Sequence, residues 1–176
     1  ELLQYFIKHR REVVTRRTIY LLRKARERGH VLEGLAVAIA NIDEVITTIK
    51  NSATPQDAKE ALLSKGWPLG TVGPFLERVG PDACRPDGLE ANFGLHEGSY
   101  HLSPAQVQAI LELRLHRLTG MEHDKLIAEY EDKLVLIGEY LEILANPARL
   151  MAVIREELEV IEQSYGDPRR TEIVDW

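Results

Sequence analysis

The fold is decided by residues 7–49, IKHRREVVTRRTIYLLRKARERGHVLEGLAVAIANIDEVITTI. Alternating steps of four and three residues from Ile7 pass through thirteen positions, ten of them apolar: Ile7, Arg11, Val14, Thr18, Leu21, Ala25, Arg28, Leu32, Leu35, Ile39, Ile42, Ile46 and Ile49. This period predicts one long helix over residues 1–50, roughly 75 Å long at ~1.5 Å per residue. Gly29 and Gly34 each disfavour a helix by about 1 kcal/mol, so we expect a bend or break there.

The middle of the chain predicts a small globular head over residues 51–121. Thr54 before Pro55 is typical of a helix start, and this helix should run to about Ser64. Residues 66–100 form a loop-rich insert, with a short helix at 74–79 and a brief extended segment at 92–99. The capping box at Ser103-Pro104-Ala105-Gln106 begins a helix through Leu118, which Gly120 should end.

Two further helices are predicted after the head. The first covers residues 122–144; the second begins at Asn146-Pro147 and stops at Gly166. Together they extend roughly 63 Å, close to the length of the first helix. We therefore predict a mainly α fold, a long antiparallel coiled coil capped by a small helical globular head. Residues 1–50 run out, 51–121 form the head, 122–166 return, and 167–176 are a tail leading to a C-terminal domain outside this sequence.

Composition is that of a soluble, foldable chain, with 44% hydrophobic and 28% charged residues among 176. No segment has the ~18 apolar residues that a membrane-spanning helix needs, and the charged N-terminus does not read as an export signal. The lone Cys84 cannot form an internal disulfide. These features predict a cytoplasmic protein. Because the helical pattern is already running at Leu2 and Leu3, we expect the sequence to be cut from a longer one.

Charge is distributed unevenly along the chain. Residues 1–30 hold nine Lys and Arg against three Glu, a net charge of +6, whereas the rest of the chain carries −12. Side chains spaced by seven on one helix could follow a phosphate backbone without reading bases. The residues that we expect to face DNA, weakly, are Arg10, Arg16, Arg17, Arg23 and Lys24. Pairing of this basic helix with the acidic helices later in the chain explains the charge distribution equally well.

Enzymatic signals are nearly absent. Glu122-His123-Asp124 lacks the second histidine, four residues away, that a helical zinc site requires. Cys84 has His96 and His101 downstream but no Asn or Asp placed to orient a base. No glycine-rich segment precedes a lysine-bearing helix, so no nucleotide loop is indicated. We therefore predict no catalytic residue, no metal ligand and no cofactor within this sequence.

An apolar surplus follows Ser103. Leu111, Leu113 and Leu115 point in different directions around a helix, so they cannot all face one core. Ordinary core packing explains one side, and a contact with a second copy of the chain would explain another.

Several long segments resemble the lower part of the A subunit of the type IIA DNA topoisomerases, and of DNA gyrase in particular. They are His9 to Thr18, Leu35 to Asp43, Gln108 to Gly120 and Gly166 to Ile173. The insert Trp67–Tyr100 and the stretch Leu118–His123 look more like gyrase than its paralogue topoisomerase IV. The resemblance covers the whole chain.

The resemblance implies a role as the exit gate, where two heads meet across a two-fold axis and release a transported DNA duplex. It implies a homodimer through Leu113, Arg114, Leu115, Arg117, Leu118 and Met121. It also implies double-stranded DNA and the gyrase B subunit as partners, with ATP and Mg supplied through that partner during ATP-dependent supercoiling. The nucleophilic tyrosine of the family would lie outside this sequence. Topoisomerase IV, the hinge of a chromosome-organising ATPase and a soluble enzyme are the alternatives.

Overall fold

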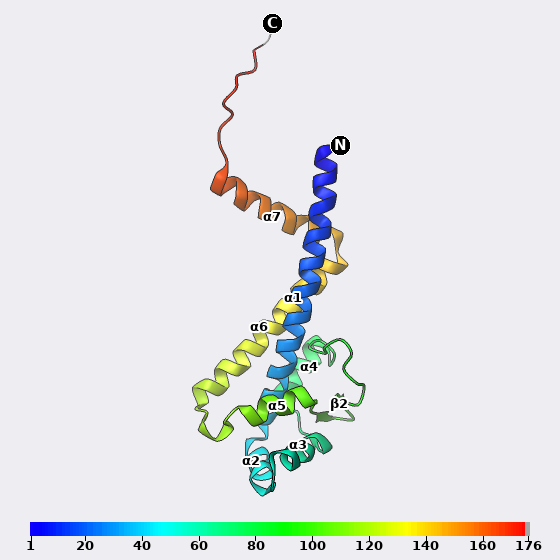
Figure 1. The fold of residues 1–176 in the computed structure, drawn as a ribbon, viewed down its shortest axis with the longest axis vertical. Coiled ribbons are helices and arrows are strands. Elements are labelled where there is room, and N and C mark those ends of the chain that lie inside the picture. Colours follow the sequence, from blue (N-terminus) through cyan, green and yellow to red (C-terminus); the bar gives the residue numbers. More distant parts are fainter. Residues whose placement is uncertain (175–176) are drawn as a thin grey trace. The chain divides into compact units, whose positions relative to one another are not determined.

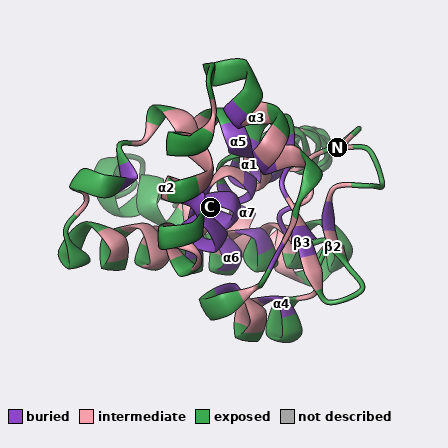
Figure 2. Cartoon of the chain, turned by 90° about the horizontal axis from the view of Figure 1, so that it is seen from below, coloured by how far each residue is buried: buried purple, intermediate pink, exposed green. Residues whose placement is uncertain are grey.

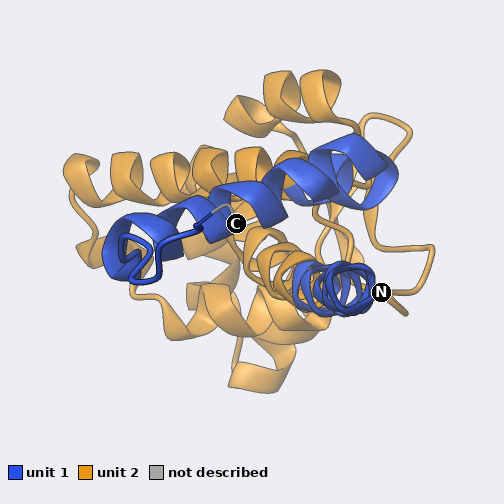
Figure 3. Ribbon diagram, turned by 90° about the horizontal axis from the view of Figure 1, so that it is seen from above, with its two compact units in different colours: residues 1–19, 140–176 blue, residues 20–139 orange. Residues whose placement is uncertain are grey.

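The computed structural model describes residues 1–174 as a mainly helical chain with one small sheet (Figure 1). It falls into two compact units (Figure 3). Unit 1 holds residues 1–19 and the chain from Tyr140 onwards, and unit 2 holds residues 20–139. The helices are α1 (Leu2–Ala40), α2 (Ile42–Asn51), α3 (Pro55–Ser64), α4 (Gly73–Val79), α5 (Pro104–Glu112), α6 (Gly120–Ala145) and α7 (Pro147–Tyr165).

The predicted first helix is confirmed in extent but is broken at Asn41, not at the glycines. Asn41 has φ −119° and ψ 32°, which ends α1 and begins α2. Its amide Nδ2 donates to the carbonyl oxygens of Val37 and Pro68, each at 2.9 Å. An asparagine side chain can bond to nearby backbone in this way and so compete with a continuing helix.

The predicted break at Gly29 or Gly34 is wrong, because α1 is continuous from Leu2 to Ala40 and both glycines lie where other elements pack closely against it. A Cβ built on Gly29 would lie 2.7 Å from Sγ of Cys84, and one on Gly34 would lie 2.6 Å from Cβ of Gln106. The glycines thus let the loop carrying Cys84 and helix α5 approach the α1 backbone, at the expense of helix propensity.

The head core forms within unit 2 around a three-stranded antiparallel sheet. Strands β1 (Gly66–Trp67), β2 (Gly94–His96) and β3 (Ser99–His101) are ordered β1-β3-β2, with Trp67 paired to Tyr100 and Leu95 to Tyr100 on the other side. Buried residues from α1, α2, α3 and α5 complete the core (Figure 2). The expected extended segment at 92–99 is confirmed by β2 and the start of β3, whereas β1 was not predicted.

Helix α5 ends at Glu112, so the predicted helix through Leu118 is wrong. Leu113 has extended backbone angles, φ −78° and ψ 117°, and residues Leu115–Arg117 form a short 3-10 turn, η2. The turn brings Leu115 into the core at 3% exposure. A continuous helix would have left the leucines pointing in several directions, and the break resolves that conflict.

Gly120 begins α6 instead of ending the previous helix. The Thr119 backbone N–H donates to Oε2 of Glu122 at 2.7 Å, and the Glu122 N–H donates to Oγ1 of Thr119 at 3.4 Å. This reciprocal pair is a capping box that was not predicted from the sequence. The predicted starts at Thr54, Ser103 and Asn146 are confirmed by side-chain caps.

Within unit 2, α6 runs in the direction opposite to α1 (Figure 1). Arg28 of α1 forms a two-pronged ion pair with Glu129 of α6, at 2.7 and 2.9 Å. The hydrogen bonds from Arg28 lower the pKa of Glu129, since they favour the charged form of its carboxyl group.

A second short 3-10 turn, η1 (Gly70–Val72), precedes α4. Among residues 1–174, no helix is long and apolar enough to cross a membrane.

Candidate functional site

The segment from Leu113 to Met121 carries all six residues expected at a dimer interface, in three different environments. Met121 is 68% exposed, whereas Leu115 is only 3% exposed and belongs to the core. Leu113 and Leu118 are half-buried, and Arg114 and Arg117 are exposed. Leu115 therefore offers almost no surface to a second chain, while the other five residues do.

A shallow groove of about 240 Å³ lies beside this segment. It is lined by Leu113, Leu118, Glu122, Lys125, Leu126 and Glu129. Its floor is apolar and its rim carries both signs of charge. The pKa of Glu122 is lowered, chiefly by the Thr119 backbone N–H that donates to its carboxylate. An apolar floor beside exposed arginines and carboxylates is the composition of a polar-rimmed protein contact.

A buried polar network lies inside unit 2 and was not predicted from the sequence. Glu33 of α1 is 3% exposed and accepts hydrogen bonds from Tyr100 and, at 2.7 Å, from Tyr130. Gln106 of α5 donates to Oη of Tyr100 at 2.8 Å and to the backbone oxygen of His30 at 2.7 Å. The network therefore joins α1, β3, α5 and α6 through side chains that have their partners.

His30 and Ser103 extend this network. Nε2 of His30 lies 2.7 Å from Oγ of Ser103, and Gln106 Oε1 accepts from the Ser103 backbone N–H at 2.9 Å. Burial lowers the pKa of His30 to about 4, with a smaller contribution from the Arg85 guanidinium. Burial has the opposite effect on acids: it raises the pKa of Glu33, and it raises the pKa of Cys84 to about 12.

The buried network stabilises the packing of these elements and is poorly placed for acid–base chemistry. Its members are buried between 0% and 4% exposure, leaving little access for a substrate. The thiol of Cys84 is 1% exposed, with a raised pKa that opposes formation of the reactive thiolate. Among residues 1–174, no three His, Cys, Asp or Glu side chains are grouped so that they could hold a metal ion.

The basic residues expected to face DNA divide between the two units. In unit 2, Arg23 lies 4.0 Å from Asp87 and Lys24 lies 3.0 Å from Glu27, in pairs that are largely exposed. Exposed pairs of this kind contribute little to stability and are screened by salt. Both side chains therefore remain accessible to a polyanion.

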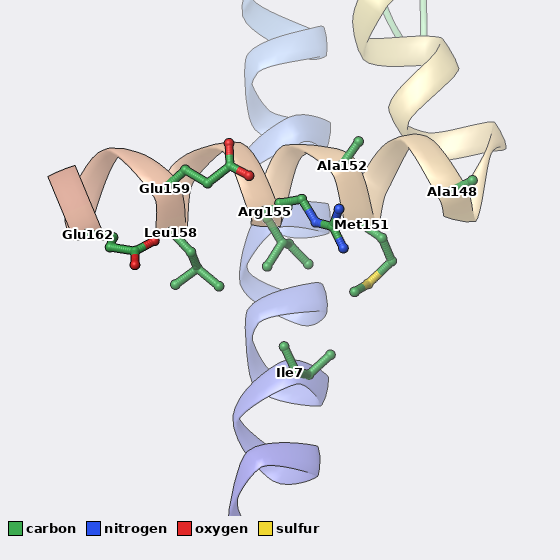
Figure 4. A pocket seen from close by; sticks show the side chains of 9 residues that line it. Ile7, Ala148, Met151, Ala152, Arg155, Leu158, Glu159 and Glu162 are labelled. Atoms are coloured by element: carbon green, nitrogen blue, oxygen red, sulfur yellow. The ribbon is translucent and has the colours of Figure 1, made fainter. Parts of the chain in front are cut away.

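In unit 1, two of the three arginines converge on one acidic residue of α7. Arg10 Nη2 lies 2.6 Å from Oε2 of Glu157, and Arg17 Nη2 contacts Oε1 of the same carboxylate. Helix α7 crosses α1 here, and apolar side chains including Met151 and Leu158 line a groove of about 580 Å³ with Ile7 (Figure 4). Arg16 is exposed and makes no ion pair with any other residue in 1–174.

The comparisons with known proteins assign the class of molecule. Residues 1–159 match the model of the family formed by the A subunits of DNA gyrase and topoisomerase IV. The chain belongs to this family. The A subunit of DNA gyrase from Pseudomonas aeruginosa is 62% identical to it over 174 residues, which are 99% of this chain and 19% of the relative.

Other bacterial relatives give the same result. The gyrase A subunit of Aeromonas salmonicida is 57% identical over 98% of this chain and 19% of the relative. The gyrase A subunit of Escherichia coli is 56% identical over 98% of this chain and 20% of the relative. The chain therefore spans about a fifth of the length of these relatives. The match sets aside both the hinge of a chromosome-organising ATPase and an unrelated soluble enzyme.

Proposed function

We propose that this chain forms the dimerisation and exit-gate region of a type II DNA topoisomerase, within the A subunit of DNA gyrase. In this role, two copies hold the enzyme together and part to release a transported duplex during ATP-dependent supercoiling. The gyrase B subunit and double-stranded DNA are the partners, and ATP and Mg act through the B subunit. The family model covers both gyrase and topoisomerase IV, and the names of the similar relatives, all gyrase A subunits, support gyrase.

The observation that carries the gate proposal is the surface from Leu113 to Met121. Met121 projects as an exposed apolar side chain, and a small apolar-floored groove lies beside it. Arg114 and Arg117 in this segment are exposed, and Glu122 and Lys125 lie at the groove rim. A two-fold axis brings one surface onto itself, so a patch with a protruding apolar group, a groove and both charges can be self-complementary. A gate that reopens needs only a standard interface, about 800 Å² per partner.

The whole chain is proposed to act as an antiparallel pair of long helical arms that carry the head. The opposite directions of α1 and α6 within unit 2, joined by Arg28 and Glu129, support such an arrangement. The arms contain the basic residues Arg10, Arg16, Arg17, Arg23 and Lys24, which we propose to contact DNA weakly and without sequence preference. This contact should weaken steeply as salt rises, because counterion release supplies most of such affinity.

The gate is tested by cross-linking Met121→Cys in a Cys84→Ala background with a flexible bifunctional maleimide. In the assembled enzyme, cross-linked heads should block supercoiling while leaving DNA cleavage intact. Val135→Cys is the matched control, since Val135 is a 61% exposed apolar residue on the same helix. Normal supercoiling by the fully cross-linked Met121→Cys enzyme would rule out the exit-gate role.

The interface residues are tested by sedimentation. Met121→Asp and Leu118→Asp should each shift the chain from dimer to monomer with unchanged helicity. Leu115→Asp is excluded from this test, because a charge at a 3% exposed position would unfold the head. If the paired variant Leu118→Asp with Met121→Asp still sediments as a dimer, the two copies meet elsewhere.

A further inference from the structure

Glu157 is placed to neutralise the basic residues of unit 1. Its two carboxylate oxygens are divided between two arginines of α1: Oε2 lies 2.6 Å from Arg10, and Oε1 contacts Arg17. Arg10 and Arg17 are seven residues apart, two helical turns, so both project from the same face of α1. One acidic side chain on α7 therefore occupies both guanidinium groups at once.

This ion-paired triad is accessible to solvent and to ligands. The side chain of Glu157 is 30% exposed, and those of Arg10 and Arg17 are 25% and 44% exposed. Arg11, next along the helix, donates to the sulfur of Met151 at 3.1 Å and not to a carboxylate. Arg16 and Lys8 are exposed without an ion pair in residues 1–174. The local surface thus has cations available, and Glu157 holds two of them.

We propose that Glu157 lowers the affinity of this face for a DNA duplex by competing with phosphate for Arg10 and Arg17. The proposal rests on the DNA contact proposed above and assigns its regulation to one residue of α7. Phosphate and carboxylate groups both accept charge-assisted hydrogen bonds from a guanidinium, so they can compete for the same donors. A duplex therefore competes with Glu157 for Nη2 of both arginines, and the carboxylate repels the phosphates nearby.

Weak affinity suits a surface along which a duplex passes. Tight binding would hold the transported duplex instead of releasing it, whereas a competing carboxylate keeps the contact short-lived. The same carboxylate joins α7 to α1 within unit 1, so a packing contact and a DNA-facing surface share one side chain.

The test compares Glu157→Gln with wild type in the 176-residue chain, using a fluorescent duplex of random sequence, about 40 base pairs long, as the probe. At low salt, Glu157→Gln should bind the duplex about tenfold more tightly, because two guanidinium groups become available to phosphate. The plot of log affinity against log salt concentration should steepen by roughly 1.8, since each added phosphate contact contributes about 0.9.

Glu159→Gln is the matched control, because Glu159 is exposed on the same helix and pairs with no cation in residues 1–174. It changes the net charge equally but should leave the salt dependence as in wild type. Adding Arg10→Gln and Arg17→Gln to Glu157→Gln should abolish the gain. Circular dichroism and melting establish that each variant is folded.

Two results would overturn the proposal in distinguishable ways. Equal affinity gains for Glu157→Gln and Glu159→Gln would mean that net charge alone matters, which removes the role of Glu157 but leaves the DNA contact. Absence of duplex binding by every variant at low salt would remove the DNA contact itself. Neither result affects the gate proposal, which the Met121 cross-link tests separately.

Discussion

Tyr130 donates a hydrogen bond of 2.7 Å to Oε1 of Glu33 in the interior of unit 2. The two residues are 97 positions apart in sequence, and both are almost completely buried, at 0% and 3% exposure. A carboxylate in this setting is tolerated only because its oxygens have donors. The stability of unit 2 should therefore depend on these donors as well as on the apolar area of the rings.

Tyr130→Phe should destabilise the chain by about 2 kcal/mol, since it leaves one oxygen of a buried carboxylate without its partner while keeping the ring. Urea unfolding followed by circular dichroism measures the loss. Tyr20→Phe is the control, because Tyr20 is 55% exposed and its hydroxyl can bond to water. Equal stability of the two variants would show that the Glu33 contact carries no weight.

Glu33→Gln should change how stability depends on pH. Burial raises the pKa of Glu33 above its ordinary value of 4.5, so the native chain holds this proton to higher pH than the unfolded chain does. The stability contributed by the protonated carboxyl is complete below a pH of about 4.5 and is lost as pH rises through the native pKa. The melting temperature of Glu33→Gln relative to wild type should therefore rise as the pH increases from about 4.5 through the native pKa of Glu33. A constant difference across this range would contradict the raised pKa.

His30 should weaken the fold in mild acid. Its pKa is lowered from 6.5 to about 4, so the unfolded chain gains a proton below 6.5 that the native chain does not accept until about 4. Stability present above about pH 6.5 should decline by up to about 3 kcal/mol as pH falls to about 4. Melting curves of His30→Gln should lack this part of the decline. His116→Gln, at an exposed position, should retain it.

Two glycine-to-alanine substitutions in helices should change the free energy of unfolding in opposite directions. Gly34→Ala should destabilise the chain by roughly 1–3 kcal/mol, because its Cβ would meet Gln106 at 2.6 Å. Gly138→Ala should stabilise it by about 0.5–1 kcal/mol, since its Cβ has nothing within 4 Å and alanine is the better helix former. Guanidinium unfolding of both variants measures the signs. Stabilisation by Gly34→Ala would mean that α5 does not pack as closely as described.

The helices were largely predictable because their signals are local. Thr54, Ser103 and Asn146 each cap a helix within three residues of themselves, so short stretches of sequence contain the whole cause. The apolar period likewise located α1, α6 and α7. The break at Asn41 was missed because one of its two carbonyl partners, on Pro68, is 27 residues away.

The interior of the candidate site was not predictable for the same reason. Glu33, Tyr100 and Tyr130 come from α1, β3 and α6, and nothing in the residues next to each of them indicates that they meet. The sequence did contain one indication of close packing, at Gly34. A glycine disfavours a helix, so its presence inside α1 indicates that another element approaches the backbone there. The Thr119–Glu122 capping box was also readable, but the apolar run before it favoured one longer helix. Because of that longer predicted helix, Leu115 was expected at the dimer surface, whereas it lies in the core at 3% exposure.

The shared carboxylate of Glu33 also determines how the head responds to mechanical load. Tyr100 of β3 and Tyr130 of α6 both donate hydrogen bonds to Glu33 of α1, and Gln106 of α5 donates to Tyr100. A pull applied along α6 within unit 2 is therefore delivered to α1 and α5 together, without first shearing one element past another. Such coupling between elements would suit the gate proposed above, in which each head carries tension from a second copy.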